Sequence, residues 1–439
     1  MKSFFDRQNP WRQPGFKFPN SPYIQRRIHQ RLIEHLSKKE ISVLIGTRQV
    51  GKTFAIQKLI EYLLTEEGVQ SNQIFYFNLD AMEFVELVKN ENLFFEFLNL
   101  YGTKKQRRFV FLDEVQRVPD CGLLLKRYYD LGINIKFVVS GSSSLEIKSQ
   151  LKESLTGRKR VFEMLPISFS EFLIFHNIKV DVPFEHKFKF ESDVYHRFLN
   201  EFILFGGYPG VVMLDRPDEK IELLEEIYRS YVQKDISDFL KVQHIIGFNR
   251  LVQMLAAQNA GLLKTNEISK LTGISSYRIE QYLHFLEDTY IIKRLRPYFK
   301  NLGKSIIKSP KAYFIDTGIY NTVFKQFQDI EMRSDQGQVL ENFVFCELIK
   351  QMKIDTIWFY RTNAGSEVDF LLNHGGRLEL VEVKYSKTRQ HVIPKIFRSL
   401  LDRLDFIKAH VLTRDYTDER DLNGIPVSFK PVWSVMEFE

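Results

Sequence analysis

The sequence predicts an α/β protein whose N-terminal part is a parallel sheet covered by helices. Four short apolar runs, SVLIG, IFYFNL, RRFVFLDE and IKFVVSG, alternate with helical patterns between residues 1 and about 165, as expected for parallel strands that are linked by helices. The first run leads through a glycine-containing loop into the apolar-periodic helix FAIQKLIEYLL. Mixed strand and helix patterns return after residue 330, so we expect a second α/β domain there.

The composition is that of an ordinary globular protein. The chain has 439 residues, of which 44% are hydrophobic and 27% are charged, which is enough for two or three domains with cores of their own. The formal net charge of +7 permits contact with nucleic acid or an anionic surface without requiring it. The two cysteines, Cys121 and Cys346, are far apart and lack metal-ligand spacing, which predicts reduced thiols in a cytoplasmic protein.

No segment has the pattern of a signal peptide or a membrane span. The first ten residues, MKSFFDRQNP, contain no apolar core. The longest apolar stretch, Phe202 to Leu214, is short and is broken by glycines and a proline, whereas a membrane helix needs about 20 apolar residues. We therefore expect no membrane partner.

Four parts can be distinguished along the chain, with boundaries that are soft by about ten residues. Residues 1–165 carry the predicted parallel sheet, and residues 166–245 are mainly helical, as in a lid or linker. Residues 246–330 resemble a small winged-helix unit, and residues 331–439 form the second predicted α/β domain.

A phosphate-binding loop lies directly after the first predicted strand. It has the pattern G-x-x-x-x-G-K-T between a strand and a helix, and its residues are Gly46, Thr47, Arg48, Gln49, Val50, Gly51, Lys52 and Thr53. Glycines there let backbone N–H groups wrap phosphates without Cβ clashes, and the helix N-terminus adds a favourable dipole. We expect Lys52 to reach the β- and γ-phosphates of ATP and Thr53 to bind Mg²⁺.

Two acids and a serine-rich turn are expected beside this loop. The apolar run RFVFL ends in Asp113 and Glu114. Asp113 is predicted to hold the Mg²⁺ shell, and Glu114 to orient and deprotonate the attacking water. The next strand ends in SGSSS, where Ser142 is our candidate for contact with the γ-phosphate or the water. The alternative role of these serines is to cap the following helix.

Together these segments resemble a family of AAA-type P-loop ATPases found across bacteria and archaea. The resemblance rests on GTRQVGKT, FVFLDEVQRV, VVSGSSS, SLTGRKRVFEMLPISFSEFL and FGGYPGVV, and it covers most of residues 25–245 before extending to the C-terminus. It implies a Walker B role for Asp113 and Glu114. A neighbouring subunit often completes such a site with a basic residue, which implies Arg158, with Arg160 second, in a homo-oligomer. The alternative for this segment is a solvated basic turn.

A helix-turn-helix pattern follows within residues 262–291. NEISKL forms the first predicted helix, TGIS forms the turn, and apolar residues at helical spacing continue the second helix. The segments KRLRPYF and KAYFID are candidate wing strands. In a DNA reader the second helix enters the major groove, and the side chains that would face bases are Ser275, Ser276, Tyr277, Arg278 and Gln281. Because Glu280 weakens the positive charge of this surface, a structural or protein-binding role stays open.

The C-terminal part resembles a restriction-endonuclease-like, or PD-(D/E)xK, domain. Its predicted order is helix, three strands, helix and strand, and the Asp…Glu-x-Lys signature is carried by Asp369, Glu382 and Lys384. A two-residue turn at residues 375–376 sets a register in which Asp369 lies opposite Glu382, and Glu367 opposite Lys384.

This register predicts a metal site. Neighbouring carboxylates repel unless a divalent cation lies between them, and oxygen ligands suit Mg²⁺ or Mn²⁺. The expected ligands are Asp369, Glu382 and, from the preceding helix, Glu341. Lys384 would hold or activate the attacking water, or stabilise the developing phosphate charge. The alternative is a pair of amphipathic strand faces with a surface ion pair between Glu367 and Lys384.

Three functions are compatible with these features. The first is a Mg²⁺-dependent ATPase that is coupled to a DNA- or protein-binding C-terminal half. The second is an ATP-regulated, metal-dependent nuclease. The third is a signalling switch that hydrolyses ATP slowly and recruits a protein partner. The sequence favours ATP hydrolysis and leaves its coupling open.

Overall fold

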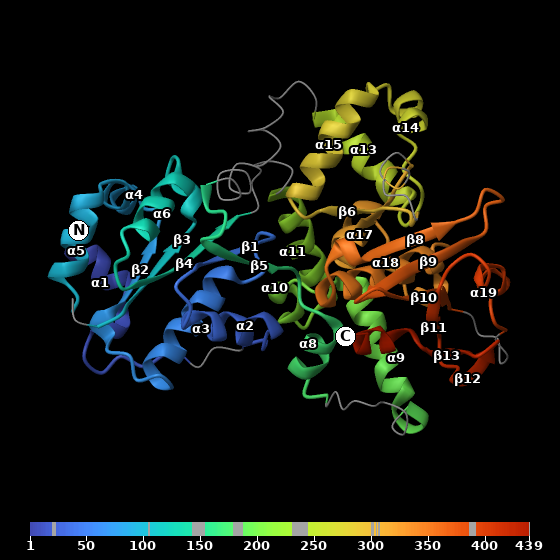
Figure 1. Ribbon diagram of the computed structural model, residues 1–439, viewed down its shortest axis with the longest axis horizontal. Coiled ribbons are helices and arrows are strands. Elements are labelled where there is room, and N and C mark those ends of the chain that lie inside the picture. Colours follow the sequence, from blue (N-terminus) through green and yellow to red (C-terminus); the bar gives the residue numbers. More distant parts are fainter. Residues whose placement is uncertain are drawn as a thin grey trace. The chain divides into compact units, whose positions relative to one another are not determined.

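The computed structural model describes residues 1–19, 23–103, 106–142, 154–178, 188–230, 245–299, 303, 305, 308–385 and 392–438. They form two compact units, Met1–Leu165 and Pro166–Glu439, and each is described by itself (Figure 1). Among the described residues, no helix combines the length and apolar character that crossing a membrane requires.

The N-terminal unit is built on a five-stranded parallel sheet, as the strand-helix alternation predicts. Its strands are β1 (Ile41–Gly46), β2 (Ile74–Asn78), β3 (Arg108–Asp113), β4 (Ile135–Ser142) and β5 (Lys159–Met164). Their order in the sheet is β2-β3-β4-β1-β5, and every neighbouring pair is parallel. The carboxyl ends of all five strands therefore lie at one edge, where ligands bind in open α/β sheets.

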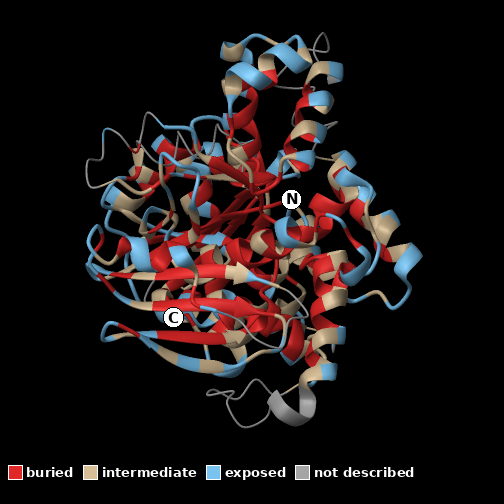
Figure 2. Ribbon diagram, turned by 90° about the vertical axis from the view of Figure 1, so that its right-hand side faces the viewer, coloured by how far each residue is buried: buried red, intermediate tan, exposed pale blue. Residues whose placement is uncertain are grey.

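Helices cover both faces of this sheet, because the strands are apolar on both sides. The helices are α1 (Lys2–Gln8), α2 (Arg27–Leu36), α3 (Lys52–Thr65), α4 (Met82–Lys89), α5 (Glu91–Leu100) and α6 (Cys121–Asp130). One face packs against α4, α5 and α6 in a core rich in phenylalanine, including Phe77, Phe94 and Phe97. On the other face, His35 of α2 contacts Ser42 of β1 at 2.7 Å. Figure 2 shows the buried strands in red, and every residue of β1 and β3 is buried.

The second unit begins with helices, as predicted for this part of the chain. They are α8 (Phe169–Phe175), α9 (Phe188–Phe205), α10 (Pro209–Val212), α11 (Pro217–Ser230) and α13 (Ile245–Ala257). The expected helix-turn-helix is present as α14 (Thr265–Thr272) and α15 (Ser276–Asp288). Gly273 ends α14 with φ at 72°, and the Ser275 hydroxyl accepts a hydrogen bond from the backbone N–H of Arg278. An antiparallel pair follows, β6 (Ile292–Leu295) with β7 (Lys311–Phe314), and then α17 (Thr317–Phe324).

The last part of the chain forms a six-stranded mixed sheet beside α18 (Gln336–Gln351). Its remaining elements are β8 (Ile357–Arg361), β9 (Glu367–His374), β10 (Arg377–Lys384), α19 (Lys395–Leu400), β11 (Phe406–Thr413), β12 (Asp418–Leu422) and β13 (Ile425–Pro431). The order in the sheet is β12-β13-β11-β10-β9-β8. Strands β8, β9 and β10 are antiparallel, and β10, β11 and β13 are parallel (Figure 1).

The hairpin between β9 and β10 has the predicted register. His374 pairs with Arg377, and the pairing continues to Phe370 opposite Val381. The two glycines of the turn have φ values of 64° and 96°, which a two-residue hairpin of this kind requires. The sequence did not predict β12 and β13, which extend the sheet beyond β11.

Candidate functional site

The predicted phosphate-binding loop, residues 46–53, joins the carboxyl end of β1 to the start of α3. Gly51 adopts the left-handed conformation, with φ at 89°, directly before α3, where a Cβ would be strained. Gly46 lies against β5, and a Cβ on it would come within 2.0 Å of the Met164 carbonyl oxygen. The loop therefore requires glycine at both positions.

Lys52 is buried inside the curve of this loop. Its side-chain Nζ donates to the carbonyl oxygens of Gly46 at 3.1 Å and of Thr47 at 2.7 Å. Burial lowers the pKa of Lys52 to about 8, against the opposing effect of Glu114 and Asp113. An anion bound in the loop would favour the charged ammonium, because it would replace carbonyl dipoles with a full negative charge.

Asp113 lies at the carboxyl end of β3 and accepts hydrogen bonds from three hydroxyl groups. Thr53 donates to Oδ2 at 2.7 Å, and Tyr76 of β2 donates to the same oxygen at 2.9 Å. Ser140 of β4 donates to Oδ1. Burial and the charge of Asp113 raise the pKa of Tyr76, so that its hydroxyl remains a donor. The acid is thus held in one orientation by residues from both neighbouring strands.

Glu114 has an unusual backbone conformation. Its φ is 58° and its ψ is 45°, and it precedes a short 3₁₀ turn, Val115–Arg117. The side-chain amide of Gln116 donates to Glu114 Oε2. A left-handed non-glycine residue costs on the order of 1 kcal/mol and recurs at functional sites. This conformation turns the chain sharply just after Asp113.

The loop and Asp113 provide the donor set that a magnesium nucleotide needs. The hydroxyl of Thr53 and the carboxylate of Asp113 are oxygen ligands of the type that Mg²⁺ prefers. Thr47 Oγ1 is buried and lacks a hydrogen-bond partner within the described part of the chain. Buried hydroxyls without partners are rare, so this one fits a site that receives a polar ligand.

The two other predicted residues of this site differ in position, because Ser142 pairs in register with Gly46 of the loop whereas Arg158 lies away from it. Ser142 is the last residue of β4, and its side chain lies outside the described residues, as do the two serines that follow it. Arg158 precedes β5, and its carbonyl accepts a hydrogen bond from Ile41 at the amino end of β1. It therefore lies at the sheet edge opposite the loop, with its side chain paired to Asp130 at 2.7 Å.

The second unit contains a carboxylate cluster near the predicted metal site. One oxygen each from Glu341 of α18 and from Glu367 and Asp369 of β9 can lie within 4.8 Å of one another. Glu382 of β10 is also buried, with 6% of its side chain exposed. Its Oε2 has no hydrogen-bond partner among the described residues.

The arrangement adds a residue to the predicted ligands Asp369, Glu382 and Glu341. The trio whose oxygens lie within 4.8 Å of one another is Glu341, Glu367 and Asp369, and Glu367 was not named as a ligand. Glu367 and Asp369 are two residues apart on one strand and so share a face, a signal that was present in the sequence. The alternative interpretation was a surface ion pair between Glu367 and Lys384. Glu367 pairs instead with Lys311 and Arg361, and Lys384 pairs with Glu382 at 2.6 Å.

Three cationic side chains contact this cluster. Arg361 pairs with Glu367 at 2.8 Å and Lys384 pairs with Glu382. Lys311 of β7, which the sequence analysis missed, contacts Glu341 at 2.8 Å and also contacts Glu367. Burial lowers the pKa of Lys311, but Glu341, Asp369 and Glu367 raise it further, so the net change is upward.

The carboxylates repel one another despite these partners. Burial and the charge of Asp369 raise the pKa of Glu341 to about 7. Burial and the charge of Glu382 likewise raise the pKa of Asp369 to about 7, although the backbone N–H of Val383 donates to it at 2.8 Å. A divalent cation would relieve this repulsion, and oxygen ligands suit Mg²⁺ or Mn²⁺. The donor set fits such an ion.

The second helix of the helix-turn-helix exposes the predicted base-contacting side chains. Exposed or half-exposed residues are Ser275, Ser276, Tyr277, Arg278 and Gln281. Glu280 faces away from them toward Arg294 at 2.7 Å, and it also accepts from Thr265 at 3.1 Å. Arg294 also pairs with Glu287, so its single positive charge is shared between two glutamates.

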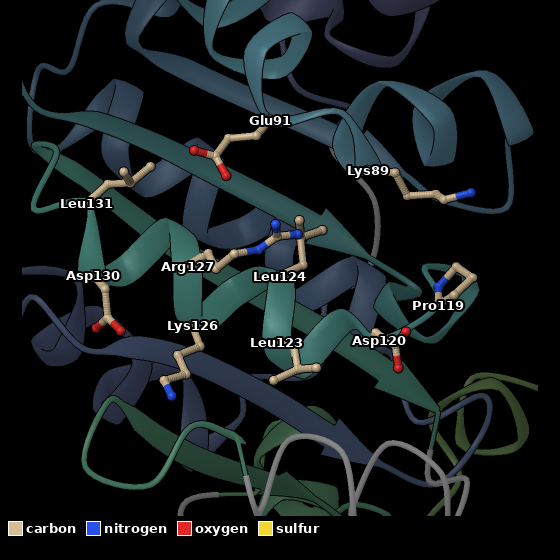
Figure 3. A pocket seen from close by; sticks show the side chains of 10 residues that line it. All are labelled: Lys89, Glu91, Pro119, Asp120, Leu123, Leu124, Lys126, Arg127, Asp130 and Leu131. Carbon is tan, nitrogen blue, oxygen red and sulfur yellow. The ribbon is translucent and has the colours of Figure 1, made fainter.

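A pocket of about 800 Å³ lies elsewhere in the N-terminal unit (Figure 3). Figure 3 shows side chains from α6 and from the adjoining ends of α4 and α5 around it, among them Leu123, Leu124 and Arg127. None of its lining residues belongs to the phosphate-binding loop, so we assign no function to it.

Comparison with known proteins supports the interpretation of the N-terminal unit. Residues 38–173 match the family model of an AAA domain. These residues carry the features of an AAA-type P-loop ATPase. Residues 196–330 match a domain of unknown function (DUF8612), and residues 336–430 match another (DUF4143). These two matches leave the winged-helix and restriction-endonuclease-like interpretations as predictions.

Relatives cover nearly the whole chain. A protein of Methanocaldococcus jannaschii is 28% identical over 90% of this chain and 86% of its own length. One of Haemophilus influenzae is 28% identical over 92% of this chain and 96% of its own length. Both are described as uncharacterised. A solved structure of Cdc6p from Pyrobaculum aerophilum has 12% identity and a TM-score of 0.28 over 72% of this chain and 98% of its own.

Proposed function

We propose that the protein binds ATP with Mg²⁺ and hydrolyses it to ADP and phosphate. The observation that carries this proposal is the contact between Thr53 and Asp113, at 2.7 Å, beside the loop that encloses Lys52. It brings together a hydroxyl and a carboxylate from two segments far apart in the sequence. These groups are the ones that hold Mg²⁺ in P-loop enzymes.

Each residue of the site has a proposed task. The backbone N–H groups of residues 46–53 and the N-terminus of α3 bind the phosphates of ATP. Lys52 leaves its two carbonyl partners and contacts the β- and γ-phosphates. Bound Mg²⁺, held by Thr53 and Asp113, would supply positive charge to the phosphate oxygens. Glu114 orients the attacking water and accepts its proton, and Ser142 contacts the γ-phosphate.

Arg158 has a place in this proposal only as a residue of a second subunit. Its position at the opposite edge of the sheet, about 20 Å away along the six-residue strand β1, prevents it from reaching the phosphates of its own chain. We therefore propose that ATP hydrolysis requires a homo-oligomer in which Arg158 contacts the nucleotide of a neighbour. Arg160 is the second candidate for this role.

Turnover of ATP by wild type, Lys52→Ala and Glu114→Gln tests the proposal, with and without duplex DNA. Glu66→Gln is a matched control for Glu114→Gln. It makes the same change from glutamate to glutamine at an exposed residue just after α3, away from the loop. Loss of turnover in Lys52→Ala and Glu114→Gln, with normal turnover in Glu66→Gln, supports the site. Activity that survives in Lys52→Ala would refute it. Stimulation by DNA would indicate a nucleic-acid partner, and DNA-independent turnover a protein partner.

The second candidate function is a metal-dependent nuclease in the C-terminal part. The favouring observation is the buried, unpartnered Oε2 of Glu382 beside the carboxylate cluster. The order α18, β8, β9, β10, α19, β11 supports the proposal, because the sequence analysis expected helix, three strands, helix and strand for a restriction-endonuclease-like core. In this proposal Asp369, Glu382 and Glu341 bind Mg²⁺ or Mn²⁺, and Lys384 holds the attacking water.

Cleavage of a plasmid with Mg²⁺ or Mn²⁺ tests this second function. Asp369→Ala should abolish cutting, whereas Asp402→Ala, which removes an exposed acid of the same domain, should not. Equal cutting by wild type and Asp369→Ala would exclude the site.

The partner of the C-terminal half is proposed from the helix-turn-helix. The exposed side chains of α15, among them Arg278, suit contact with DNA. A signalling switch that hydrolyses ATP slowly and recruits a protein is the alternative. We retain four domains, 1–165, 166–245, 246–330 and 331–439, as part of this proposal.

A further inference from the structure

Lys311 provides a buried positive charge inside the carboxylate cluster. It is the first residue of β7, which pairs with β6 and not with the strands that carry the acids. Only 3% of its side chain is exposed. Its Nζ contacts Glu341 Oε1 at 2.8 Å and Glu367 Oε1. An ammonium in this position bridges two of the three carboxylates that could hold a metal ion.

The acids of the cluster differ in how far they are already neutralised. Glu341 Oε1 also accepts a hydrogen bond from the buried Tyr313 hydroxyl at 2.6 Å, and Glu367 has Arg361 as a further partner. Asp369 has the backbone N–H of Val383. Glu382 Oε2 has no partner among the described residues, although its side chain is more than nine-tenths buried.

Because the four carboxylates differ in their partners, the cluster has two places where a positive charge can lie between carboxylates. The position between Glu341 and Glu367 is filled by the Lys311 ammonium. The other is beside Asp369 and Glu382, where a buried carboxylate oxygen remains without a partner. Four carboxylates face three cationic side chains, Lys311, Arg361 and Lys384. One negative charge is therefore left over when all are ionised, and a further cation would balance it.

We propose that this site binds one divalent cation, at Asp369 and Glu382, and that Lys311 takes the place of a second. Two-metal nucleases hold their ions about 3.5–4 Å apart and use both to stabilise the reacting oxygens. A lysine ammonium is a compact point charge that fits between two carboxylates. The inference rests on the metal-dependent site proposed above and narrows it, because Lys311 occupies Glu341 and the bound ion keeps Asp369 and Glu382.

The experiment is a count of bound Mn²⁺ in the full chain, without nucleotide. The Asp369→Asn/Glu382→Gln double variant is the reference, because ions bound elsewhere are common to both proteins and cancel. Wild type should bind one more ion than the reference. Lys311→Met should bind two more, and its electron paramagnetic resonance spectrum should show the spin coupling of a close Mn²⁺ pair.

Arg361→Met is the matched control. It removes a positive charge from the same carboxylate, Glu367, but on its exposed side, so the count should stay at one. If Lys311→Met is unfolded by circular dichroism, Lys311→Gln takes its place, since it keeps a donor toward Glu341 and Glu367.

The outcomes separate the inference from the function on which it rests. A count of one in the Lys311 variant, or of two in wild type, would overturn the role of Lys311 and leave the metal site intact. A wild-type count equal to that of the reference would overturn the metal site itself, and the proposed nuclease with it.

Discussion

Tyr76→Phe should lower the affinity of the ATPase for Mg²⁺ without removing any proposed ligand. The substitution deletes one hydroxyl, which donates to Asp113 Oδ2 at 2.9 Å, and leaves the ring in the core. Asp113 keeps its hydrogen bonds from Thr53 and Ser140. The acid therefore stays in place but is oriented less firmly.

The size of the effect follows from the kind of bond that is lost. A hydrogen bond to a charged group contributes about 1.5–3 kcal/mol, which corresponds to about 10–150-fold in an equilibrium constant. Loss of groups that orient metal ligands lowers metal affinity or activity by about 10–100-fold. We expect the Mg²⁺ concentration for half-maximal turnover to rise by such a factor, with a smaller change at saturating Mg²⁺.

The assay is ATP turnover as a function of Mg²⁺ at fixed ATP. Tyr62→Phe is the control, because it also deletes a tyrosine hydroxyl that donates to a carboxylate, at 2.6 Å to Glu67 on the surface. Ser140→Ala should resemble Tyr76→Phe, since it removes the donor to the other oxygen of Asp113. An unchanged Mg²⁺ dependence in Tyr76→Phe, or an equal change in Tyr62→Phe, would refute the role assigned to Asp113.

Three other predictions concern the same functions. Glu114→Gln should keep nucleotide affinity, measured by fluorescence titration, but lower turnover by about 10²–10⁴-fold, the usual range for general base catalysis; equal loss of affinity would point to a structural role. Arg158→Ala should lose turnover but not ATP binding. If Arg158 acts between subunits, mixing this variant with Lys52→Ala should restore part of the activity. No restoration would indicate that the main role of Arg158 is its ion pair with Asp130. Arg278→Ala should weaken DNA binding and lower the salt slope by about 1 if it contacts a phosphate, and an unchanged slope would favour a protein partner.

The nucleotide site could be predicted in detail because its geometry is local. The loop, its two required glycines and the helix behind it are consecutive residues, so their spacing in the sequence already fixes their arrangement. Asp113 was found because parallel strands end at one edge of a sheet. Tyr76 was not singled out, because its contact depends on which strand lies next to β3, and strand order is not visible in the pattern.

The carboxylate cluster shows where such reasoning fails. The hairpin register was predicted correctly from the two glycines of its turn, yet Glu367 was not named among the ligands, although it shares a face of β9 with Asp369. Lys311 could not be found from spacing, since it reaches the cluster from a different sheet. The strand β12 was missed because its sequence DERDL has the charged composition of an edge strand, which resembles a loop.

The contacts of β7 have a consequence for how the chain can be divided. Lys311 and Tyr313 lie in the segment that matches DUF8612, whereas Glu341 and Glu367 lie in the segment that matches DUF4143. A fragment that began between these two matched segments would carry buried acids without their cation, at a cost of several kcal/mol. The two matched segments therefore share one buried cluster of charged side chains within the compact unit Pro166–Glu439.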